Sequence, residues 1–582
     1  MKRIALISTL ALLPIVSAVG AYYESRVTPY VVAAVVIAVT VLAVLGNVKG
    51  CQFFILYSLS LSLLWGTSMI GSHVIGNDIH SEMYVANRAI ENGWDIAYRN
   101  GGNTSLVVAG IAPVLDRIGF DVVWQFKALY PALFAFVPPI LFIAYRKITG
   151  DGVAMIAALV VMVMPMFVLD MTGHVKGMVS QLFLVCAIAL IFRSDVRARY
   201  RYPGIVLSVI GAIVNHYSVA AMTVIMLVGS CGVGVVFWLC NWYRSKRKIK
   251  LKFTPPAKTL SVALATSVVM LLLWYSLAGG GAMLSTLLRT GSNFVVNISG
   301  VEKTESLQRQ YDNRTQPVEV TGTYLDKQEQ LIRTAIGLDF MSVDVYGKTF
   351  RMLQFVTQVV IIVGVFMLWR KYYNKEPVYT AMLVAVSVII AMIILVPYLA
   401  TVMSATRFYQ YALFVASPAM VAGLMFLLRK RWIVAVFLSL YIVFTLGVVF
   451  EATNQDDITM VNIPYSLAMS NQRMNINGVF GANDLSAREW LLERYKENKQ
   501  TMIRSDYNGK QFLSEVIGEN VVSGELPSSG YYLYVTEWSS LNNTMILGKA
   551  PGLRYYYDLD EWIPEQAQLV AQYGSALIYR ID

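Results

Sequence analysis

Long apolar stretches dominate the chain and limit what it can fold into. The hydrocarbon of a bilayer offers no water to the backbone, so a chain crosses it as a helix of about 20 mostly apolar residues. Only 14% of the 582 residues are charged, against about 25% in an ordinary soluble domain. We therefore predict an all-α polytopic membrane domain of about 13 transmembrane helices, at residues 4–22, 29–47, 51–70, 124–145, 152–170, 177–192, 204–214, 216–240, 258–278, 351–369, 378–400, 408–428 and 432–450.

Basic residues lie on one side of these predicted spans. Short cytoplasmic loops carry an excess of Lys and Arg, and the basic runs fall together at 2–3, 146–147, 193–201, 244–252, 370–375 and 429–431. The amino terminus is then cytoplasmic, and the loops 71–123 and 279–350 and the tail lie outside. The net charge of +11 reflects this topology and does not indicate a nucleic-acid partner. Residues 1–21 also fit a cleaved signal peptide, which would change the side of no later loop.

The tail differs from the rest of the chain. A helical pattern at 484–499 is followed by strand-like runs at 501–504, 531–536 and 576–581, which is typical of a small soluble α/β domain. We therefore divide the chain into a transmembrane domain, 1–450, and an extracytoplasmic domain, 451–582.

An acidic motif follows the third predicted span directly. Asp78, His80 and Glu82 alternate along the chain a few residues from hydrocarbon, where charges are costly unless a partner or substrate uses them. In an extended segment all three share a face, whereas in a helix Asp78 and Glu82 share one at i, i+4. The structural alternative is a solvated loop start with a helix cap.

Cationic and titratable groups occupy the outer ends of other spans. His174 and Lys176 lie between the fifth and sixth spans, His216 and Tyr217 enter the eighth, and Arg407 enters the twelfth. A bound phosphate needs cationic donors, so this common depth predicts a phosphate site. Lys176 and Arg407 equally fit snorkelling anchors, and His216 fits a packing histidine. The glycine-hinged loop at 279–350 is either a lid over such a site or a connector.

Three short stretches carry a resemblance to a known group. Residues 77–82 (Asn-Asp-Ile-His-Ser-Glu), 215–218 (Asn-His-Tyr-Ser) and 405–409 (Ala-Thr-Arg-Phe-Tyr) resemble a largely archaeal group of membrane glycosyltransferases within the GT-C superfamily. The resemblance implies that Asp78 is the catalytic base or a metal ligand, with Glu82 as second carboxylate. It implies a divalent cation, Mg or Mn, as a candidate cofactor, with Lys176 and Arg407 holding the donor phosphate, assisted by His174, His216 and Tyr217.

The chemistry fits sugar transfer at the outer face. An acceptor hydroxyl that attacks a phosphate-linked sugar needs a carboxylate to take its proton and cations to stabilise the departing phosphate. We predict a polyprenyl-phosphate sugar as donor and a glycan, a lipid-linked molecule or a protein as acceptor, with Asp78, His80 and Glu82 as the catalytic group. The alternatives are a secondary transporter or flippase, and an oligosaccharyltransferase or glycan polymerase. The tail lacks the Trp-Trp-Asp motif of oligosaccharyltransferases, which makes transfer of a single sugar the favoured version.

Overall fold

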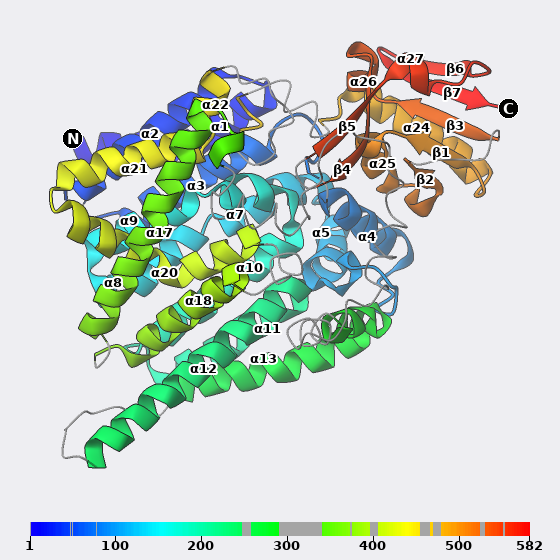
Figure 1. The fold of residues 1–582 in the computed structure, drawn as a ribbon. Coiled ribbons are helices and arrows are strands. Elements are labelled where there is room, and N and C mark those ends of the chain that lie inside the picture. The colour runs from blue at the N-terminus through cyan, green and yellow to red at the C-terminus, as the bar shows by residue number, and fades with distance from the viewer. Residues whose placement is uncertain are drawn as a thin grey trace.

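The computed structural model describes residues 2–46, 48, 50–76, 78–246, 258–289, 340–372, 375–395, 405–453, 466–469, 479–523, 530–550 and 553–582. Each predicted span overlaps helical structure, and together these helices form a bundle (Figure 1). Its elements are α1 (Lys2–Tyr22), α2 (Val27–Val44), α3 (Gln52–Ser68), α6 (Val122–Trp124), η3 (Gln125–Leu129), α7 (Tyr130–Phe134), α8 (Val137–Thr149), α9 (Asp151–Met162), η4 (Met166–Asp170), η5 (Met171–Gly173), α10 (Val175–Phe192), α11 (Ala198–Asn215), α12 (Tyr217–Lys246), α13 (Lys258–Leu277), η6 (Ala278–Gly281), η7 (Phe340–Ser342), α17 (Val345–Tyr372), α18 (Pro377–Leu395), α20 (Ala405–Leu428), α21 (Arg431–Thr445) and α22 (Val448–Ala452).

Several of these helices are long and apolar enough to cross a bilayer. Among the described residues 7 helices meet both criteria, or up to 8 if the bent pair Asp151–Met162 and Met166–Gly173 is one span. The two halves of that pair meet at 57°. Shorter apolar helices lie at Leu10–Tyr22, Pro377–Ile393 and Arg431–Thr445. The structure is that of a multi-pass membrane protein, and the number 13 stays a prediction.

The first outer loop is mostly helical. It contains α4 (Asp78–Asn92), the 3₁₀ turn η1 (Gly102–Thr104), the π-helical η2 (Leu106–Ile111) and α5 (Ala112–Arg117). Asn103 holds the turn before η1, because its side-chain amide donates to the carbonyl oxygens of Asp95 and Tyr98 at 2.8 and 2.9 Å. Most of the second outer loop predicted, 279–350, lies outside the described residues.

The tail folds around a mixed sheet. Five strands have the order β2-β1-β3-β7-β6, with β2, β1 and β3 parallel and β7 and β6 antiparallel to their neighbours, and β4 and β5 form a separate hairpin. The predicted helix and three strands are present, and β2, β4, β5 and β6 were not predicted. The elements are α24 (Ala482–Glu497), β1 (Met502–Ser505), α25 (Tyr507–Ser514), η8 (Gly518–Asn520), β2 (Val521–Val522), β3 (Tyr531–Val535), α26 (Glu537–Leu541), β4 (Thr544–Ala550), β5 (Leu553–Asp558), α27 (Leu559–Trp562), β6 (Gln568–Tyr573) and β7 (Ala576–Ile581).

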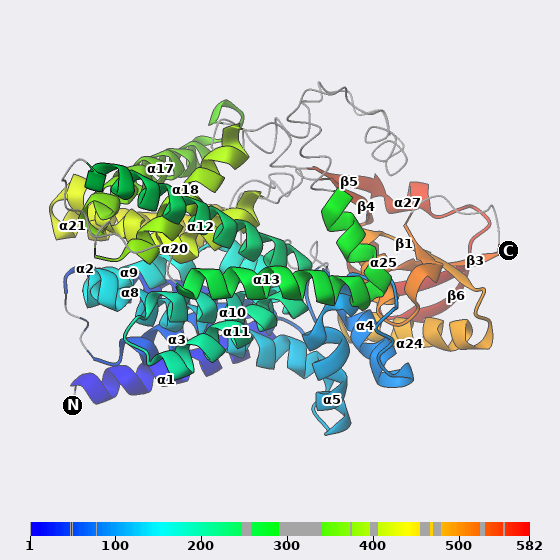
Figure 2. The ribbon, with the colours of Figure 1, turned by 90° about the horizontal axis from the view of Figure 1, so that it is seen from below.

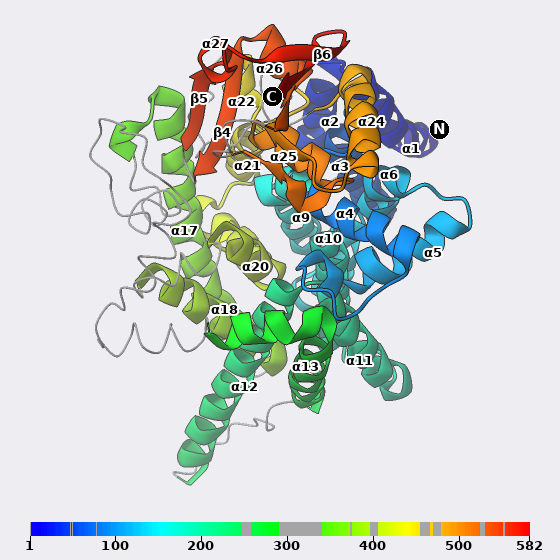
Figure 3. The ribbon, with the colours of Figure 1, turned by 90° about the vertical axis from the view of Figure 1, so that its right-hand side faces the viewer.

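The tail sheet has a core of its own and rests on the first outer loop. Leu491, Phe512 and Ile578 are buried in a cluster separate from the core of the helix bundle. Figures 2 and 3 show α24 and α25 beside α4, and α25 contacts α4 directly. This contact brings the carboxyl-terminal part of the chain over the segment that carries the acidic motif.

Close packing of α17 on α20 fixes the helix that carries Arg407. A Cβ atom added to Gly423 on α20 would lie 2.1 Å from the carbonyl oxygen of Val360, and one added to Gly364 on α17 would lie 1.8 Å from that of Ala419. Both obstacles are backbone atoms, which cannot rotate away. The two helices therefore approach as closely as they do only because glycine stands at the crossing.

We expect Gly423→Ala to destabilise the bundle by about 1–3 kcal/mol, the usual cost of overpacking. Thermal unfolding of the purified protein in detergent measures this as a lower Tm. Gly232→Ala on α12 is the matched control, because a Cβ there meets nothing within 4 Å. Equal melting temperatures for the two variants would contradict the close crossing.

Candidate functional site

The first turn of α4 points its acidic residues in one direction and its histidine in another. Residues four apart share a face of a helix, whereas residues two apart are separated by about 200°. Asp78 and Glu82 accordingly face α10 and its preceding turn, and His80 faces the tail. The helical alternative for the motif is correct, and His80 does not join the two carboxylates. Asp78 also stands at the positive amino end of the helix, a favourable place for a carboxylate.

A close backbone approach places Asp78 next to His174. Gly76 adopts a φ of +133°, and a Cβ atom there would lie 2.9 Å from Cα of Gly173. Any larger residue would separate the two segments. The Asp78 carboxylate consequently comes within 2.9 Å of the His174 ring, from Oδ2 to Nε2.

His174 connects Asp78 to Asp170 and Arg407. Its Nδ1 donates to the backbone carbonyl of Asp170 at 2.8 Å, and its Nε2 also lies 2.8 Å from Nη2 of Arg407. The guanidinium Nε in turn lies 3.3 Å from Oδ2 of Asp170. Four groups from α4, the turn before α10 and the start of α20 thus form one network.

The protonation states in this network follow from its contacts. Burial alone would lower the pKa of His174, but its hydrogen bond with Asp78 and the charges of Asp170 and Asp78 outweigh burial and raise the pKa. Burial alone would raise the pKa of Asp78, but the His174 hydrogen bond and the nearby cations hold it well below its usual range. Both directions favour the charged forms of the two groups, an imidazolium and a carboxylate, in their mutual contact.

Lys176 and Glu82 form a buried ion pair beneath this network. The ammonium Nζ lies 3.2 Å from Oε1 of Glu82, and the backbone N–H of Lys176 donates to Oε2 at 3.2 Å. The Glu82 side chain is 0% exposed. A charge at this depth is tolerated only when it is paired, so Glu82 holds Lys176 near the outer end of α10.

Exposure divides the six groups into an inner and an outer set. The side chains of Asp78, Asp170 and Arg407 are 48%, 37% and 28% exposed, whereas His174 and Lys176 are 8% and 10% exposed. A molecule that approaches from outside meets an accessible carboxylate and an accessible guanidinium first. The buried cations lie directly behind them.

His216 and Tyr217 lie near the network, and they also stabilise the start of α12. The Nδ1 atom of His216 accepts from the backbone N–H of Ser218 and Val219, at 3.1 and 3.3 Å, and so caps α12. Its ring stacks on that of Tyr217 with centroids 5.2 Å apart. Lys176 and Arg407 lie close enough to act electrostatically on His216. These contacts agree with the interpretation of His216 as a packing histidine.

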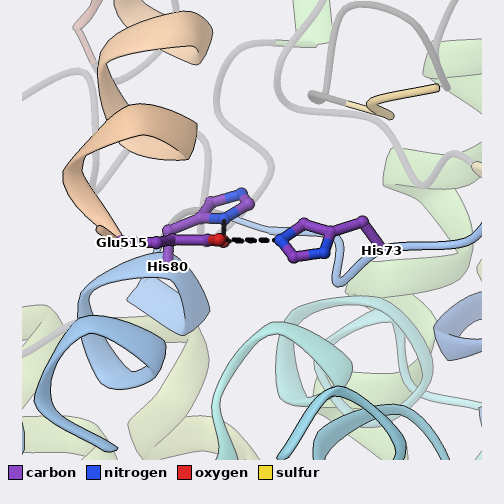
Figure 4. A group of neighbouring side chains, drawn as sticks. All are labelled: His73, His80 and Glu515. Carbon is purple, nitrogen blue, oxygen red and sulfur yellow. Dashed lines mark hydrogen bonds and ion pairs between the residues drawn. The ribbon is translucent and has the colours of Figure 1, made fainter. Parts of the chain in front are cut away.

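A second cluster joins the first outer loop to the tail. His73 Nε2 lies 2.7 Å from Oε2 of Glu515, and His80 Nδ1 contacts Oε1 (Figure 4). Arg488 Nη1 also donates to Oε2, at 2.5 Å. His73, His80 and Glu515 are all buried. Burial alone would raise the pKa of Glu515, but the two histidines outweigh it and hold the pKa below its usual range, whereas burial lowers the pKa of His73.

His73, Arg488 and Glu515 escaped the sequence analysis, as did Asp170 and Lys127, whereas His80 was expected in the catalytic group and instead contacts Glu515. Glu515 has no local signal, since its two histidine partners are more than 400 positions away in the chain. Lys127 did carry one, because a lysine inside a predicted span needs a partner. Its Nζ donates to the carbonyl oxygens of Ile70, Gly71 and His73 at 2.7, 3.0 and 2.6 Å.

Two places in the described residues have groups that a cation could use. His73, His80 and Glu515 offer one ligand atom each, all within 4.8 Å of one another. The carboxylates of Asp78 and Glu82, the pair expected from sequence, each face a cationic partner instead.

A family described as a predicted membrane protein, DUF2206, matches residues 204–580. The chain belongs to this family. The match covers well over half of the chain, including α20 with Arg407 and all but the last residue of the tail sheet. No curated protein matches the chain.

Three solved structures are similar to the chain. An oligosaccharyltransferase of Archaeoglobus fulgidus, solved with Zn and sulfate, has a TM-score of 0.45 and 12% identity over 84% of this chain and 68% of its own. ArnT from Cupriavidus metallidurans, bound to undecaprenyl phosphate, has a TM-score of 0.46 and 11% identity over 91% and 98%. AglB from Archaeoglobus fulgidus, with an inhibitory peptide and a dolichol-phosphate, has a TM-score of 0.44 and 11% identity over 88% and 74%. Similarity at this level carries no information on activity.

We expect Glu82→Gln to cost about 3–5 kcal/mol of stability, because it leaves the Lys176 ammonium buried without a counter-charge. Adding Lys176→Met should recover most of that loss, since it removes the orphaned charge. Chemical unfolding in detergent measures both. Glu91→Gln, at the exposed end of the same helix, is the control and should change stability by less than about 0.5 kcal/mol. A double variant no more stable than Glu82→Gln would contradict the buried pair.

Proposed function

We propose that the chain is a membrane glycosyltransferase that moves a sugar from a polyprenyl-phosphate donor to a glycan, lipid-linked or protein acceptor outside the membrane. The observation that carries this proposal is the accessible edge formed by Asp78 and Arg407, which His174 joins. Direct displacement from a sugar phosphate needs a base for the acceptor and a cation for the leaving group, a few ångströms apart. The resemblance of the motifs at 77–82, 215–218 and 405–409 to GT-C enzymes supports the same chemistry.

In the proposed reaction the acceptor oxygen attacks the anomeric carbon of the sugar. Its proton passes to the carboxylate of Asp78, and the bond between the anomeric carbon and the phosphate oxygen breaks. The electron pair of that bond leaves with the polyprenyl phosphate, whose charge Arg407 and Lys176 stabilise. His174 is a positioning residue, because its ring contacts the Asp78 carboxylate, from Nε2 to Oδ2, at 2.9 Å. A single displacement inverts the anomeric carbon.

We also propose that the site lies on the outer side of the membrane. With the amino terminus in the cytoplasm, all thirteen predicted spans crossing, and the tail outside, Asp78, Lys176 and Arg407 lie at the outer interface. A polyprenyl chain then extends into the hydrocarbon while its phosphate reaches the network. This location suits a donor that is half lipid and half sugar.

A divalent cation, Mg or Mn, is part of the proposal at Asp78. Mg²⁺ is commonly bound by one or two carboxylates together with substrate phosphate oxygens. The side chain of Asp78 is 48% exposed, so its carboxylate could supply one ligand to such a shared site, as the alternative to acting as the base. Glu82 would support it indirectly, by keeping Lys176 charged and in place.

We expect Asp78→Asn to reduce transfer by about 10²–10⁴-fold, the usual contribution of a general base. The assay incubates the purified protein in nanodiscs with radiolabelled polyprenyl-phosphate sugars and glycan, lipid-linked and peptide acceptors. Asp116→Asn, in the same outer loop, is the matched control and should transfer like wild type. Full activity of Asp78→Asn would remove it as the base. If wild type transfers nothing but moves a labelled solute into proteoliposomes, the chain is a transporter.

Arg407→Gln should weaken binding of the leaving group, polyprenyl phosphate, by at least about tenfold, because a charge-assisted contact to phosphate contributes roughly 1.5–3 kcal/mol. Native mass spectrometry of the full chain titrated with this lipid measures binding without turnover. Arg117→Gln, an exposed arginine on α5, is the control. Equal affinities of the two variants would place the phosphate elsewhere.

A further inference from the structure

The cluster of His73, His80 and Glu515 plays no part in the proposed transfer. His73 precedes α4, His80 lies in its first turn, and Glu515 follows α25 in the tail. Figure 4 shows both imidazole rings directed at one carboxylate. The three side chains come from two separately folded parts of the chain and are 5%, 1% and 0% exposed.

The residues that surround the cluster are held in place by contacts of their own. Lys127 binds the carbonyl oxygen of His73 and two others just before it, which fixes the backbone that carries this histidine. The ring of Phe512 meets that of His73 edge-on at 5.5 Å, and Phe480 meets His80 likewise at 6.0 Å. The two phenylalanines stack on each other at 4.0 Å. Apolar walls around converging ligand atoms limit solvent access to the site.

The donor set is that of a zinc site. Zinc binds imidazole nitrogen at about 2.0–2.1 Å and carboxylate oxygen at about 2.0–2.2 Å, and two histidines with one glutamate are an established protein ligand set for it. Ligand atoms around a tetrahedral zinc lie about 3.3 Å apart. His73 Nε2 already lies 3.0 Å from Oε1 of Glu515, so small side-chain movements would admit the ion.

Arg488 complements this arrangement. It donates to Oε2 of Glu515 at 2.5 Å and leaves Oε1, the oxygen that His80 contacts, for the metal. A ligating carboxylate is commonly oriented by a hydrogen bond to its second oxygen. The guanidinium is itself held over the Phe512 ring, 4.5 Å from its centroid.

We propose that His73, His80 and Glu515 bind one zinc ion, which clasps the tail domain to the first outer loop. The ion takes Nε2 of His73, Nδ1 of His80 and Oε1 of Glu515, with a water completing the tetrahedron. The clasp holds α25 against α4 and keeps Tyr507 of the tail close to Asp78, whose charge acts on the Tyr507 hydroxyl. This site is separate from the proposed transferase network.

The test is metal binding by the full-length protein in detergent. The protein is stripped with chelator, dialysed, reloaded with zinc chloride and analysed by elemental mass spectrometry. We expect one zinc per chain in wild type and a loss of affinity above about 100-fold in His73→Ala and Glu515→Gln, since losing an outer partner alone costs about 10–100-fold. Glu497→Gln, an exposed glutamate of the same domain, should bind zinc like wild type.

Two further measurements keep the result interpretable if a variant folds poorly. Glu515→His restores a ligand and should regain zinc, and X-ray absorption of loaded wild type should show nitrogen and oxygen ligands at about 2.0–2.1 Å. Hydrogen exchange in wild type should slow on zinc loading in both 70–76 and α25. Stripped wild type that is folded but takes up no zinc overturns the proposal, and so does equal zinc binding by wild type, His73→Ala and Glu515→Gln.

Discussion

A buried charge must be paired, and this requirement organises the outer end of the molecule. Glu82 and Glu515 are fully buried, and each faces cationic or imidazole groups from elements far away in sequence. Removing one partner of a buried pair costs about 3–5 kcal/mol, so the contacts fix the relative positions of α4, α10 and α25. Lys127 satisfies the same requirement with three backbone carbonyls in place of a carboxylate.

The two clusters on α4 differ in what they leave accessible. In the network of Asp78 and Arg407, buried groups support exposed ones, which suits a site where a molecule binds and reacts. In the cluster around Glu515 every ligand atom is enclosed, which suits a permanent connection. The same short helix therefore carries both the proposed reactive edge and an interdomain contact, on separate faces.

Sequence reasoning found the groups whose signal is local. A charged residue at the end of an apolar run is conspicuous, and Asp78, Lys176 and Arg407 were identified in this way. Their partners were not: Asp170 lay inside a predicted span, and Glu515 occupies an ordinary position at the end of a short helix. Pairing between residues hundreds of positions apart depends on how the helices pack, which no local pattern encodes. A local signal also decided which strands were found: the three strands with clear apolar patterns were predicted, and the two-residue β2 was not.

The first turn of α4 couples the two clusters, because it carries one residue of each. Asp78 and His80 are two positions apart and point in nearly opposite directions from a single rigid helical turn. Any rotation of that turn that draws His80 away from Glu515 also draws Asp78 away from His174. Docking or displacement of the tail domain would therefore change the orientation of Asp78 on the other side of the helix, through the rigid turn that Asp78 and His80 share.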